Sequence, residues 1–368
     1  MARRLLLLNG VAIIFVILFH TTGYGFTALF FWAHRYRPVA APNFDAAGTA
    51  PYWALRLMEE LVCVAIPIFL FVSGYFVSVM AGRTRVVGAG TMRTRIAALI
   101  PPYLLWSGIV LLGLALEGRV YPLRRYAVML ATGSTNPNYY YVPLLVQLYL
   151  VAPVVVRLLA WNWRVTLAVT GLMQACVYGL QYAIVLAPQS PTVLLAATLA
   201  QKWVFLVHLF WFTFGAFVGL EAQRFRTLVD RARPFLVPAT VVFFALGVIE
   251  WEMLLAWSGQ PWTENRTTLV DGAYSASFLM SFLAYAEIPA PWSSWLTTLG
   301  SRSFGIYLVH GLVMEYFSRG LYHLAPWALG RQALFLPALI AVGMAVPLML
   351  MDVVNRSPAR RAYAYVFG

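Results

Sequence analysis

The chain begins with the stretch "RRLLLLNGVAIIFVILFH", residues 3–20, an apolar run that contains one polar residue, Asn9, and stops at His20. A run of about 20 apolar residues can cross the roughly 30 Å hydrocarbon core of a bilayer as a helix, because each residue adds about 1.5 Å. The run therefore predicts a first transmembrane helix. It also places an ionisable imidazole within the span, and such a group is a functional hypothesis by default.

The whole chain has the composition of a multi-pass membrane protein. Of its 368 residues, 61% are hydrophobic and 11% are charged, and the mean hydropathy is +0.75. A soluble domain is far less apolar. Two arginines before an apolar run also suit a signal peptide, but no A-x-A cleavage signal follows and further spans come after, so the sequence favours a retained helix.

The charge and the cysteines exclude two classes of site. The net charge of +13 does not indicate nucleic-acid binding, because the arginines fall in short clusters between apolar segments, as orientation signals and anion sites do. Cys63 and Cys176 lie far apart in apolar spans, without a second Cys or His at ligand spacing. The sequence therefore predicts neither a disulfide framework nor a metal site.

Apolar windows of about 20 residues predict an all-α bundle of about ten transmembrane helices, with both termini on one side. There is no repeat of fixed period, no low-complexity tract and no soluble segment, so residues 1–368 are predicted to form a single transmembrane domain. The predicted spans are Leu5–Ala28, Leu57–Met80, Ile96–Leu116, Tyr139–Ala160, Val165–Ala187, Trp203–Glu221, Phe235–Ala256, Leu269–Glu287, Ser303–Phe317 and Gln332–Asp352.

The distribution of Lys and Arg between the loops predicts cytoplasmic N- and C-termini. With that orientation, 16 of the 26 basic residues lie on the cytoplasmic side, and the other ten are spread over longer outer loops. His20 is then predicted in the outer half of the bilayer, about 22 Å along the first helix. Acidic residues collect at a similar depth: Glu59, Glu60, Glu250, Glu252 and Asp271.

Four further stretches follow in order along the chain. They are "PIFLFVSGYF" from Pro67, "RTRIAALIPPYLLW" from Arg93, "YYYVPLLVQLYLVAP" from Tyr139 and "GSRSFGIYLVHG" from Gly300. Together with the helix that ends at His20, they resemble the membrane-bound acyltransferase 3 family, in the form without an attached extracytoplasmic hydrolase-like domain. The resemblance covers essentially the whole chain.

The resemblance implies an activity and a location. Members transfer an acyl group, commonly acetyl, from cytoplasmic acyl-CoA to a hydroxyl of a surface or lipid-linked glycan. The expected location is a bacterial-type cytoplasmic membrane, and the expected partners are acyl-CoA, the glycan acceptor and the lipid bilayer. O-succinyl transfer to an exopolysaccharide is the alternative within the family.

The resemblance also implies that the catalytic histidine is His20, at the end of the first helix. The chemistry of the residue agrees, because O-acyl transfer needs a base for the proton of the attacking sugar hydroxyl and histidine titrates near neutral pH. A carboxylate that accepts the other N–H of the ring would fix its tautomer. Glu60 is predicted for this role, with Glu59 and Asp271 as alternatives.

For the acyl-CoA, the resemblance implies an arginine pair before the third helix, near Arg93 and Arg95. Arginine forks can bind the phosphates of CoA bidentately, whereas the alternative reading is a simple positive-inside signal. Two positions depart from the family pattern. Asn9 stands where the first helix of the family often carries arginine, and Ala98 interrupts the usual R-x-x-R that would start at Arg95.

The remaining polar residues within the spans have two readings each. Ser73 with Gly74 predicts close helix packing, and contact of Ser73 and Tyr75 with the pantetheine arm of CoA is the alternative. By default, Tyr139–Tyr141 are predicted to form an outer interfacial belt. Gln147 and Tyr149 lie deeper, where polar groups need partners, so with Tyr141 they are a hypothesis for a tunnel wall.

Ser303, Tyr307 and His310 follow at helical spacings of four and three, so they can share one face of a membrane helix. Polar groups on one face should point into the bundle. Structural hydrogen bonding is the favoured reading of His310, and a second functional histidine is the alternative.

Two other classes of protein compete with the enzyme. A transporter or flippase also suits a polar path with intramembrane histidines, but no inverted repeat is detectable. A structural or sensory module predicts no solvent path to His20. The sequence does not identify the glycan, the acyl group or the oligomeric state, nor whether an acyl-histidine intermediate forms.

Overall fold

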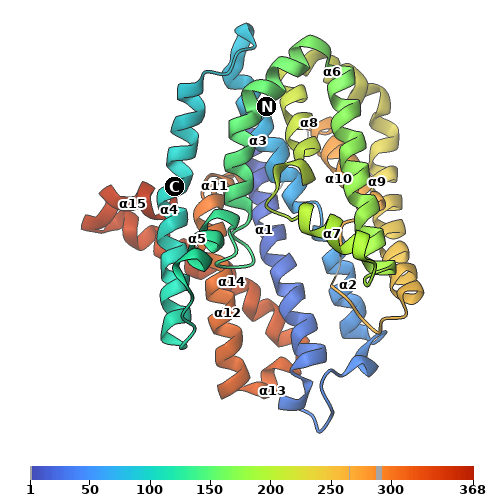
Figure 1. Cartoon of the computed structure of the whole chain (residues 1–368), viewed down its shortest axis with the longest axis vertical. Helices are drawn as coiled ribbons and strands as arrows, with labels where there is room; N and C mark the ends of the chain where they lie inside the picture. The colour runs from blue at the N-terminus through green and yellow to red at the C-terminus, as the bar shows by residue number, and fades with distance from the viewer. Residues whose placement is uncertain (1, 265, 287–291) are drawn as a thin grey trace.

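The computed structural model describes residues 2–264, 266–286 and 292–368, and all regular elements within these ranges are helical. The long helices run roughly along one axis and form a bundle (Figure 1). The helices are α1 (Ala2–Phe26), α2 (Ala50–Val62), α3 (Ala65–Ala81), α4 (Ala89–Leu116), α5 (Leu123–Thr132), α6 (Tyr141–Leu186), α7 (Pro191–Leu199), α8 (Leu209–Leu220), α9 (Ala222–Ser258), α10 (Leu269–Ala284), α11 (Ser293–Ser301), α12 (Ser303–Leu324), α13 (Pro326–Leu329), α14 (Gln332–Arg356) and α15 (Tyr363–Phe367). Short turns of other helix types are η1 (Thr27–Phe31), η2 (Ala33–Arg35), η3 (Phe44–Ala46), η4 (Gly82–Thr84), η5 (Phe205–Val207) and η6 (Pro358–Ala362).

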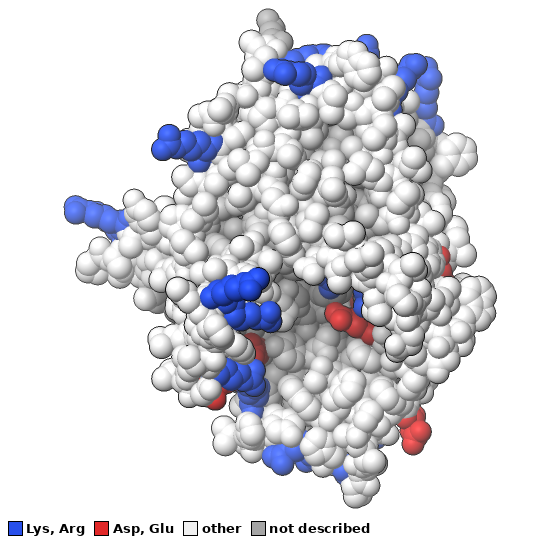
Figure 2. Space-filling view, in the orientation of Figure 1, with Lys and Arg blue, Asp and Glu red and all other residues white. Residues whose placement is uncertain are grey.

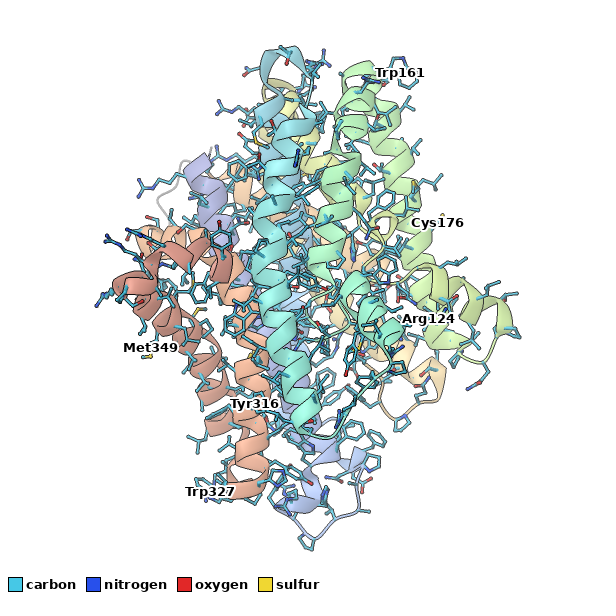
Figure 3. All side chains as sticks on the ribbon, turned by 60° about the vertical axis from the view of Figure 1, so that its left-hand side comes forward. Arg124, Trp161, Cys176, Tyr316, Trp327 and Met349 are labelled. Carbon is cyan, nitrogen blue, oxygen red and sulfur yellow. The ribbon has the colours of Figure 1, made fainter. Side chains whose placement is uncertain are left out.

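The prediction of an all-α membrane protein is confirmed. Within the described ranges, six helical segments are long and apolar enough to cross a membrane: Arg3–Phe31, Ala50–Ala81, Ala89–Leu116, Tyr141–Leu186, Ala222–Ser258 and Gln332–Arg356. Large apolar side chains also cover the outside of the molecule. Tyr316, Trp327 and Met349 are at least half exposed and point away from the bundle (Figure 3), as expected of a surface in contact with lipid.

The predicted windows and the observed helices differ at several places. The fourth and fifth windows agree with the structure in one respect, because α6 consists of two helices that meet at a kink where Asn162 leaves the helical dihedral angles, between the two windows. The window 203–221 forms a helix only in α8, and the window 269–287 forms α10, with its predicted end at residue 287 outside the described ranges. Helices of 12 and 16 residues are short for a full crossing. The count of about ten spans and the cytoplasmic termini therefore stay predictions.

The second predicted span is broken into two helices. α2 ends at Val62 and α3 begins at Ala65, and Pro67 lies in the first turn of α3, where its missing N–H costs no hydrogen bond. The break is mild, because the two linking residues, Cys63 and Val64, keep right-handed helical dihedral angles.

The first helix lies in the centre of the bundle. α1 contacts α2, α3, α11, α12 and α14 (Figure 1). Its side chains Leu5, Leu8, Ala12, Ile13 and Ile17 are almost completely buried. The helix that carries His20 is therefore packed on several sides by other helices, and a polar group on it meets protein rather than lipid.

Glycines allow a very close helix crossing between α3 and α8. A Cβ atom on Gly74 would lie 1.9 Å from the carbonyl oxygen of Phe212, and one on Gly215 would lie 1.9 Å from that of Phe71. The two backbones therefore touch, because small residues remove the side chains between them. The packing role predicted for Gly74 is confirmed.

This contact predicts a loss of stability for Gly74→Ala. The added methyl group overlaps a backbone carbonyl that cannot rotate away, so α3 and α8 must separate at a cost of about 1–3 kcal/mol or more. Thermal unfolding of the detergent-solubilised protein measures the loss. Gly108→Ala on α4 is the matched control, since a Cβ there has no neighbour within 4 Å. Equal stability of both variants would contradict the crossing.

The expected interfacial belt of tyrosines is wrong. Tyr139 is fully buried and Tyr141 is 7% exposed. The Tyr139 hydroxyl donates a hydrogen bond of 2.6 Å to the carbonyl oxygen of Leu308 on α12. The segment before α6 is thus fastened to α12, because a phenol inside the bundle can satisfy its hydroxyl on a backbone carbonyl.

Candidate functional site

Two histidines meet inside the bundle, His20 on α1 and His310 on α12. Their ring centroids are 5.2 Å apart and the ring planes are inclined by 40°. His310 is completely buried, whereas His20 is half-buried and so can be reached by a small group. This meeting was not predicted from the sequence, because the two helices are far apart along the chain and only their packing joins them.

The hydrogen bonds of His310 define its tautomer. Its Nδ1 lies 2.7 Å from the carbonyl oxygen of Tyr307 and 3.1 Å from that of Ile306. Carbonyl oxygens only accept, so Nδ1 carries the proton and Nε2 is an acceptor. Among the described residues that buried Nε2 has no hydrogen-bond partner, and the His20 imidazole makes no hydrogen bond. In this pair, His310 therefore presents Nε2 as a hydrogen-bond acceptor, and both ring nitrogens of His20 lack a hydrogen bond to the described residues.

Ser303, Tyr307 and His310 are all buried on α12, which confirms that this face points into the bundle. Their hydrogen bonds differ. The Ser303 hydroxyl donates to the Gly300 carbonyl oxygen at 2.9 Å and so stays at the start of the helix. Tyr307 donates its hydroxyl to the carbonyl oxygen of Asn138 and lies with its ring 6.1 Å from that of His310. Tyr307 thus fixes the segment before α6 next to the histidine pair.

Further tyrosines continue from Tyr307 along α6. The Tyr141 ring lies 5.6 Å from the Tyr307 ring, and Ser73 of α3 lies next to the Tyr141 hydroxyl. Tyr149 follows two turns later on the same helix and interacts electrostatically with Tyr141. These residues connect the histidine pair with the part of α6 that runs to its bend.

Arg95 lies at the other end of this row. Its guanidinium is 5.9 Å from the centre of the Tyr149 ring and 3.3 Å from the sulfur of Met80. Arg95 belongs to the first turns of α4, near the end of the bundle where α1 also begins (Figure 1). Arg93, two residues earlier, is exposed. The row from Arg95 through the tyrosines to the histidine pair is called the polar row below.

Other predicted site residues have partners outside the polar row. Gln147 donates to the Trp203 carbonyl oxygen at 2.8 Å and accepts from the Phe205 N–H at 3.4 Å, so its amide holds the loop before α8. Tyr75 is 9% exposed and interacts electrostatically with Arg226. The oxygen of the Asn9 side chain is buried, and no described residue bonds to it.

The carboxylate predicted to orient His20 has another partner. Glu60 accepts a hydrogen bond from Arg56 at 3.1 Å, and Glu59 accepts one from the same guanidinium at 3.0 Å. No carboxylate in the described ranges bonds to His20. The reason lies within α2, where helical spacing places both glutamates beside the buried arginine one turn earlier.

The third candidate carboxylate, Asp271, caps α10. It accepts from the Thr268 N–H at 2.8 Å, and its own N–H donates to the Thr268 hydroxyl at 3.3 Å. Ligand atoms of Glu60, Cys63 and Asp271 lie within 4.8 Å of one another, and in the described part of the chain this is the one group of three possible metal ligands. The sequence spacing could not reveal it, because Asp271 comes from a distant helix.

Two residues of the site were missed by the sequence analysis, Lys202 and His208. The Lys202 ammonium is close enough to interact electrostatically with the imidazoles of both His20 and His208. The Nε2 atom of His208 is buried without a described hydrogen-bond partner. A signal existed in the sequence, since Lys202 is the single lysine of the chain.

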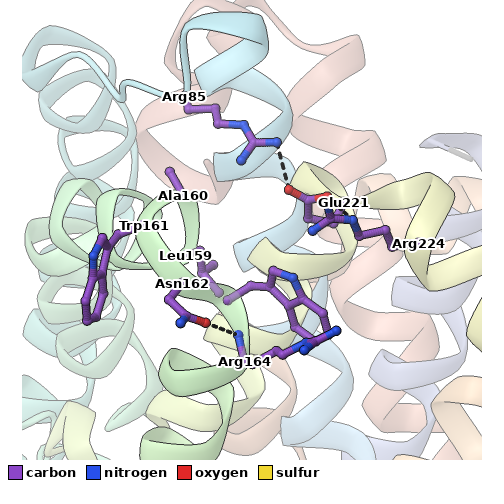
Figure 4. A pocket seen from close by; sticks show the side chains of 9 residues that line it. Arg85, Leu159, Ala160, Trp161, Asn162, Arg164, Glu221 and Arg224 are labelled. Atoms are coloured by element: carbon purple, nitrogen blue, oxygen red, sulfur yellow. Dashed lines mark hydrogen bonds and ion pairs between the residues drawn. The ribbon is translucent and has the colours of Figure 1, made fainter.

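A pocket opens at the bend of α6, at the end of the bundle where α4 begins. Its volume is about 580 Å³, and three arginines line it with Glu221 and the residues around the bend (Figure 4). Arg85 forms an ion pair of 2.7 Å with Glu221, and Asn162 accepts the N–H of Arg164 at 3.1 Å. The lining residues are Arg85, Leu159, Ala160, Trp161, Asn162, Trp163, Arg164, Glu221 and Arg224.

Comparison with known proteins identifies the family. A model of the acyltransferase 3 family, described as an acyltransferase domain, matches residues 5–352. Comparison with curated proteins gives no match, and comparison with solved structures gives none either. The matched range contains almost the whole chain, including the histidine pair, the polar row and the pocket at the bend of α6. The chain therefore belongs to the acyltransferase 3 family.

Proposed function

We propose that this protein transfers an acyl group, acetyl or a similarly small one, from acyl-CoA to a hydroxyl of a surface or lipid-linked glycan. The observation that carries the proposal is the polar row, which leads from a cationic end at Arg95 to the histidine pair. Acyl-CoA needs cations for its phosphates and a base near its thioester, and the two ends of the row provide these groups. The expected setting is a cytoplasmic membrane of bacterial type.

In the proposed reaction His20 is the general base. It takes the proton of the glycan hydroxyl while the oxygen attacks the thioester carbonyl carbon. The carbon–sulfur bond breaks, and the proton passes from His20 to the departing sulfur, so that ester and free CoA thiol are the products. The acceptor Nε2 of His310 can take a hydrogen bond from the second ring nitrogen of His20 and so orient it, the task that a carboxylate has in hydrolytic triads.

The direct test is an assay of the purified protein in lipid nanodiscs. With acyl-CoA and the glycan fraction of a host that lacks the gene, the enzyme should release free thiol and add the mass of one acyl group to the glycan. Movement of glycan across the membrane without a covalent change would support a transporter instead.

The donor end of the row predicts the effect of Arg95→Ala. A hydrogen bond to a charged group contributes about 1.5–3 kcal/mol, so the KM for acyl-CoA should rise by about tenfold to a hundredfold with little change in kcat. Initial rates at varied acyl-CoA concentration measure both constants. Arg360→Ala, which removes an exposed arginine near the C-terminus, is the control. An unchanged KM in Arg95→Ala would place the phosphates elsewhere.

A further inference from the structure

The pocket at the bend of α6 carries more positive than negative charge. Three arginines line it, and Glu221 is the acidic residue of its lining. The arginines come from three parts of the chain, because Arg85 precedes α4, Arg164 follows the kink of α6 and Arg224 lies in the first turn of α9 (Figure 4). Three positive charges and one negative charge leave an excess of two positive charges. The pocket therefore has the charge of an anion-binding site.

Glu221 balances only part of this charge. Its carboxylate lies 2.7 Å from the Arg85 guanidinium and 3.4 Å from that of Arg224. Within the described ranges, Arg164 has no carboxylate at ion-pair distance. The surface shows the same bias, since on the face in Figure 2 basic side chains lie at the end with the α6 bend, whereas the acidic ones lie in its middle and lower parts.

The size and the walls of the pocket suit a ligand larger than a phosphate ion. Its volume of about 580 Å³ lies in the range of sites that hold whole small molecules and cofactors. Trp161 and Trp163 are part of the lining, and the Trp163 ring stacks on Phe217 with the centroids 4.9 Å apart. The Arg164 guanidinium lies 5.3 Å from the centre of the Trp163 ring. Aromatic rings beside guanidinium groups suit a nucleobase that carries phosphate.

The pocket lies beyond Arg95, on the side away from the histidine pair. Tyr149, whose ring faces Arg95, follows Tyr141 by eight residues, which is about 12 Å along α6. Leu159 of the pocket follows Tyr149 by ten residues, about 15 Å further on. The order along α6 is therefore histidine pair, tyrosines, Arg95 and pocket. Acyl-CoA has its groups in a matching order: acyl thioester, pantetheine arm, diphosphate and adenosine 3′-phosphate.

We infer that this pocket binds the adenosine 3′-phosphate end of the acyl-CoA, with Arg164 as the partner of the 3′-phosphate. The inference rests on the proposed function, because it assigns a further part of the proposed donor to a site of its own. A phosphate monoester has a charge of about −1.5 to −2 at pH 7, which matches the excess of two positive charges, and arginine forks bind phosphate bidentately. A lipid headgroup that ends in phosphate has the same chemistry, so the experiment separates the two sources.

Binding of nucleotide fragments tests the inference without turnover. The protein is placed in nanodiscs of phosphatidylcholine, and calorimetry measures the Kd of adenosine 3′,5′-bisphosphate and of adenosine 5′-monophosphate, which differ in the 3′-phosphate alone. The bisphosphate should bind at least about tenfold more tightly, as expected of hydrogen bonds between charged groups. Equal affinities of the two nucleotides overturn the inference.

Two variants test the role of Arg164. Arg164→Gln should remove most of the preference for the bisphosphate, and the fold should lose little, since this arginine is exposed and has no described carboxylate partner. Arg124→Gln is the matched control, because Arg124 is an exposed arginine of α5 outside the pocket (Figure 3), and it should retain the preference. A preference that persists unchanged in Arg164→Gln would contradict the assignment.

Nanodiscs that contain phosphatidic acid test the lipid source, because the headgroup of this lipid is also a phosphate monoester. If the pocket belongs to acyl-CoA, the bisphosphate keeps its affinity and its dependence on Arg164 in these nanodiscs. The lipid source predicts that bisphosphate binding is lost there, and that phosphatidic acid is retained by the native protein but not by Arg164→Gln. That result would assign the pocket to a lipid and overturn its assignment to acyl-CoA.

Donor kinetics distinguishes a failure of this inference from a failure of the proposed function. The KM for acyl-CoA should be at least about tenfold lower than the KM for its dephospho form, and Arg164→Gln should bring this ratio close to one. Acyl transfer with equal KM values for the two donors would refute the nucleotide pocket and leave the transferase standing. Binding of the bisphosphate through Arg164 without any acyl transfer would leave the pocket standing and refute the transferase.

Discussion

Substitution of His20 by Gln is expected to lower the kcat of acyl transfer by about 10²- to 10⁴-fold, the usual contribution of a positioned general base. Gln retains polarity and approximate size but cannot take the proton of the attacking hydroxyl. His20 makes no hydrogen bond to the described residues, so the fold loses little when the imidazole is removed. The KM for acyl-CoA should stay near that of the native protein, because the Arg95 guanidinium proposed to bind the phosphates is unchanged.

Single-turnover measurements of thiol release and of acylated glycan give the effect on the chemical step. His323→Gln is the matched control, since it makes the same change at an exposed histidine. Thermal unfolding of both variants shows whether they are folded. A folded His20→Gln variant with native kcat would remove the base from the proposed mechanism, and His310 or His208 would then have to be examined for this role.

The approximate positions of the helices along the chain could be predicted from the sequence, but the residues at which they begin and end could not. Apolar windows identify where helices lie because length and composition are set by the bilayer. They end and restart on either side of Asn162, where α6 has its kink, but they do not show that α2 and α3 separate near Cys63. This separation depends on single backbone angles and on neighbouring helices, which a window average does not contain.

The site was predictable where sequence spacing corresponds to proximity in space. Tyr307 and His310 share a helix face, so their common burial could be expected. The meeting of His20 with His310 depends on helix packing and could not be predicted. The ion pairs of Arg56 with Glu59 and Glu60 were not predicted, although the arginine precedes them by three and four residues, a spacing that allows such contacts on a helix.

The second large effect is expected at Arg56, which should be essential for stability. Its side chain is 1% exposed and binds Glu59 and Glu60, both also buried. Asp271 is buried beside them, and a Cβ atom on Gly247 would lie 2.1 Å from a Glu60 oxygen and 3.3 Å from an Asp271 oxygen. Two buried carboxylates thus share one buried cation, and Asp271 lies close to one of them, Glu60.

Arg56→Met is therefore expected to destabilise the fold by about 3–5 kcal/mol, the cost of leaving one partner of a buried ion pair uncompensated. Unfolding by SDS in mixed micelles measures the change. Arg119→Met is the control, because that arginine is 57% exposed and its ion pair with Glu117 should contribute at most about 1 kcal/mol.

A double variant distinguishes loss of charge balance from loss of packing. If the cost arises from unpaired carboxylates, Glu60→Gln should be destabilising alone but should restore part of the stability when combined with Arg56→Met, since it removes one buried negative charge. If the cost arises from the lost volume and contacts of the arginine, the two effects should simply add. Additivity would mean that Arg56 acts mainly by filling space and not by balancing the charge of Glu60.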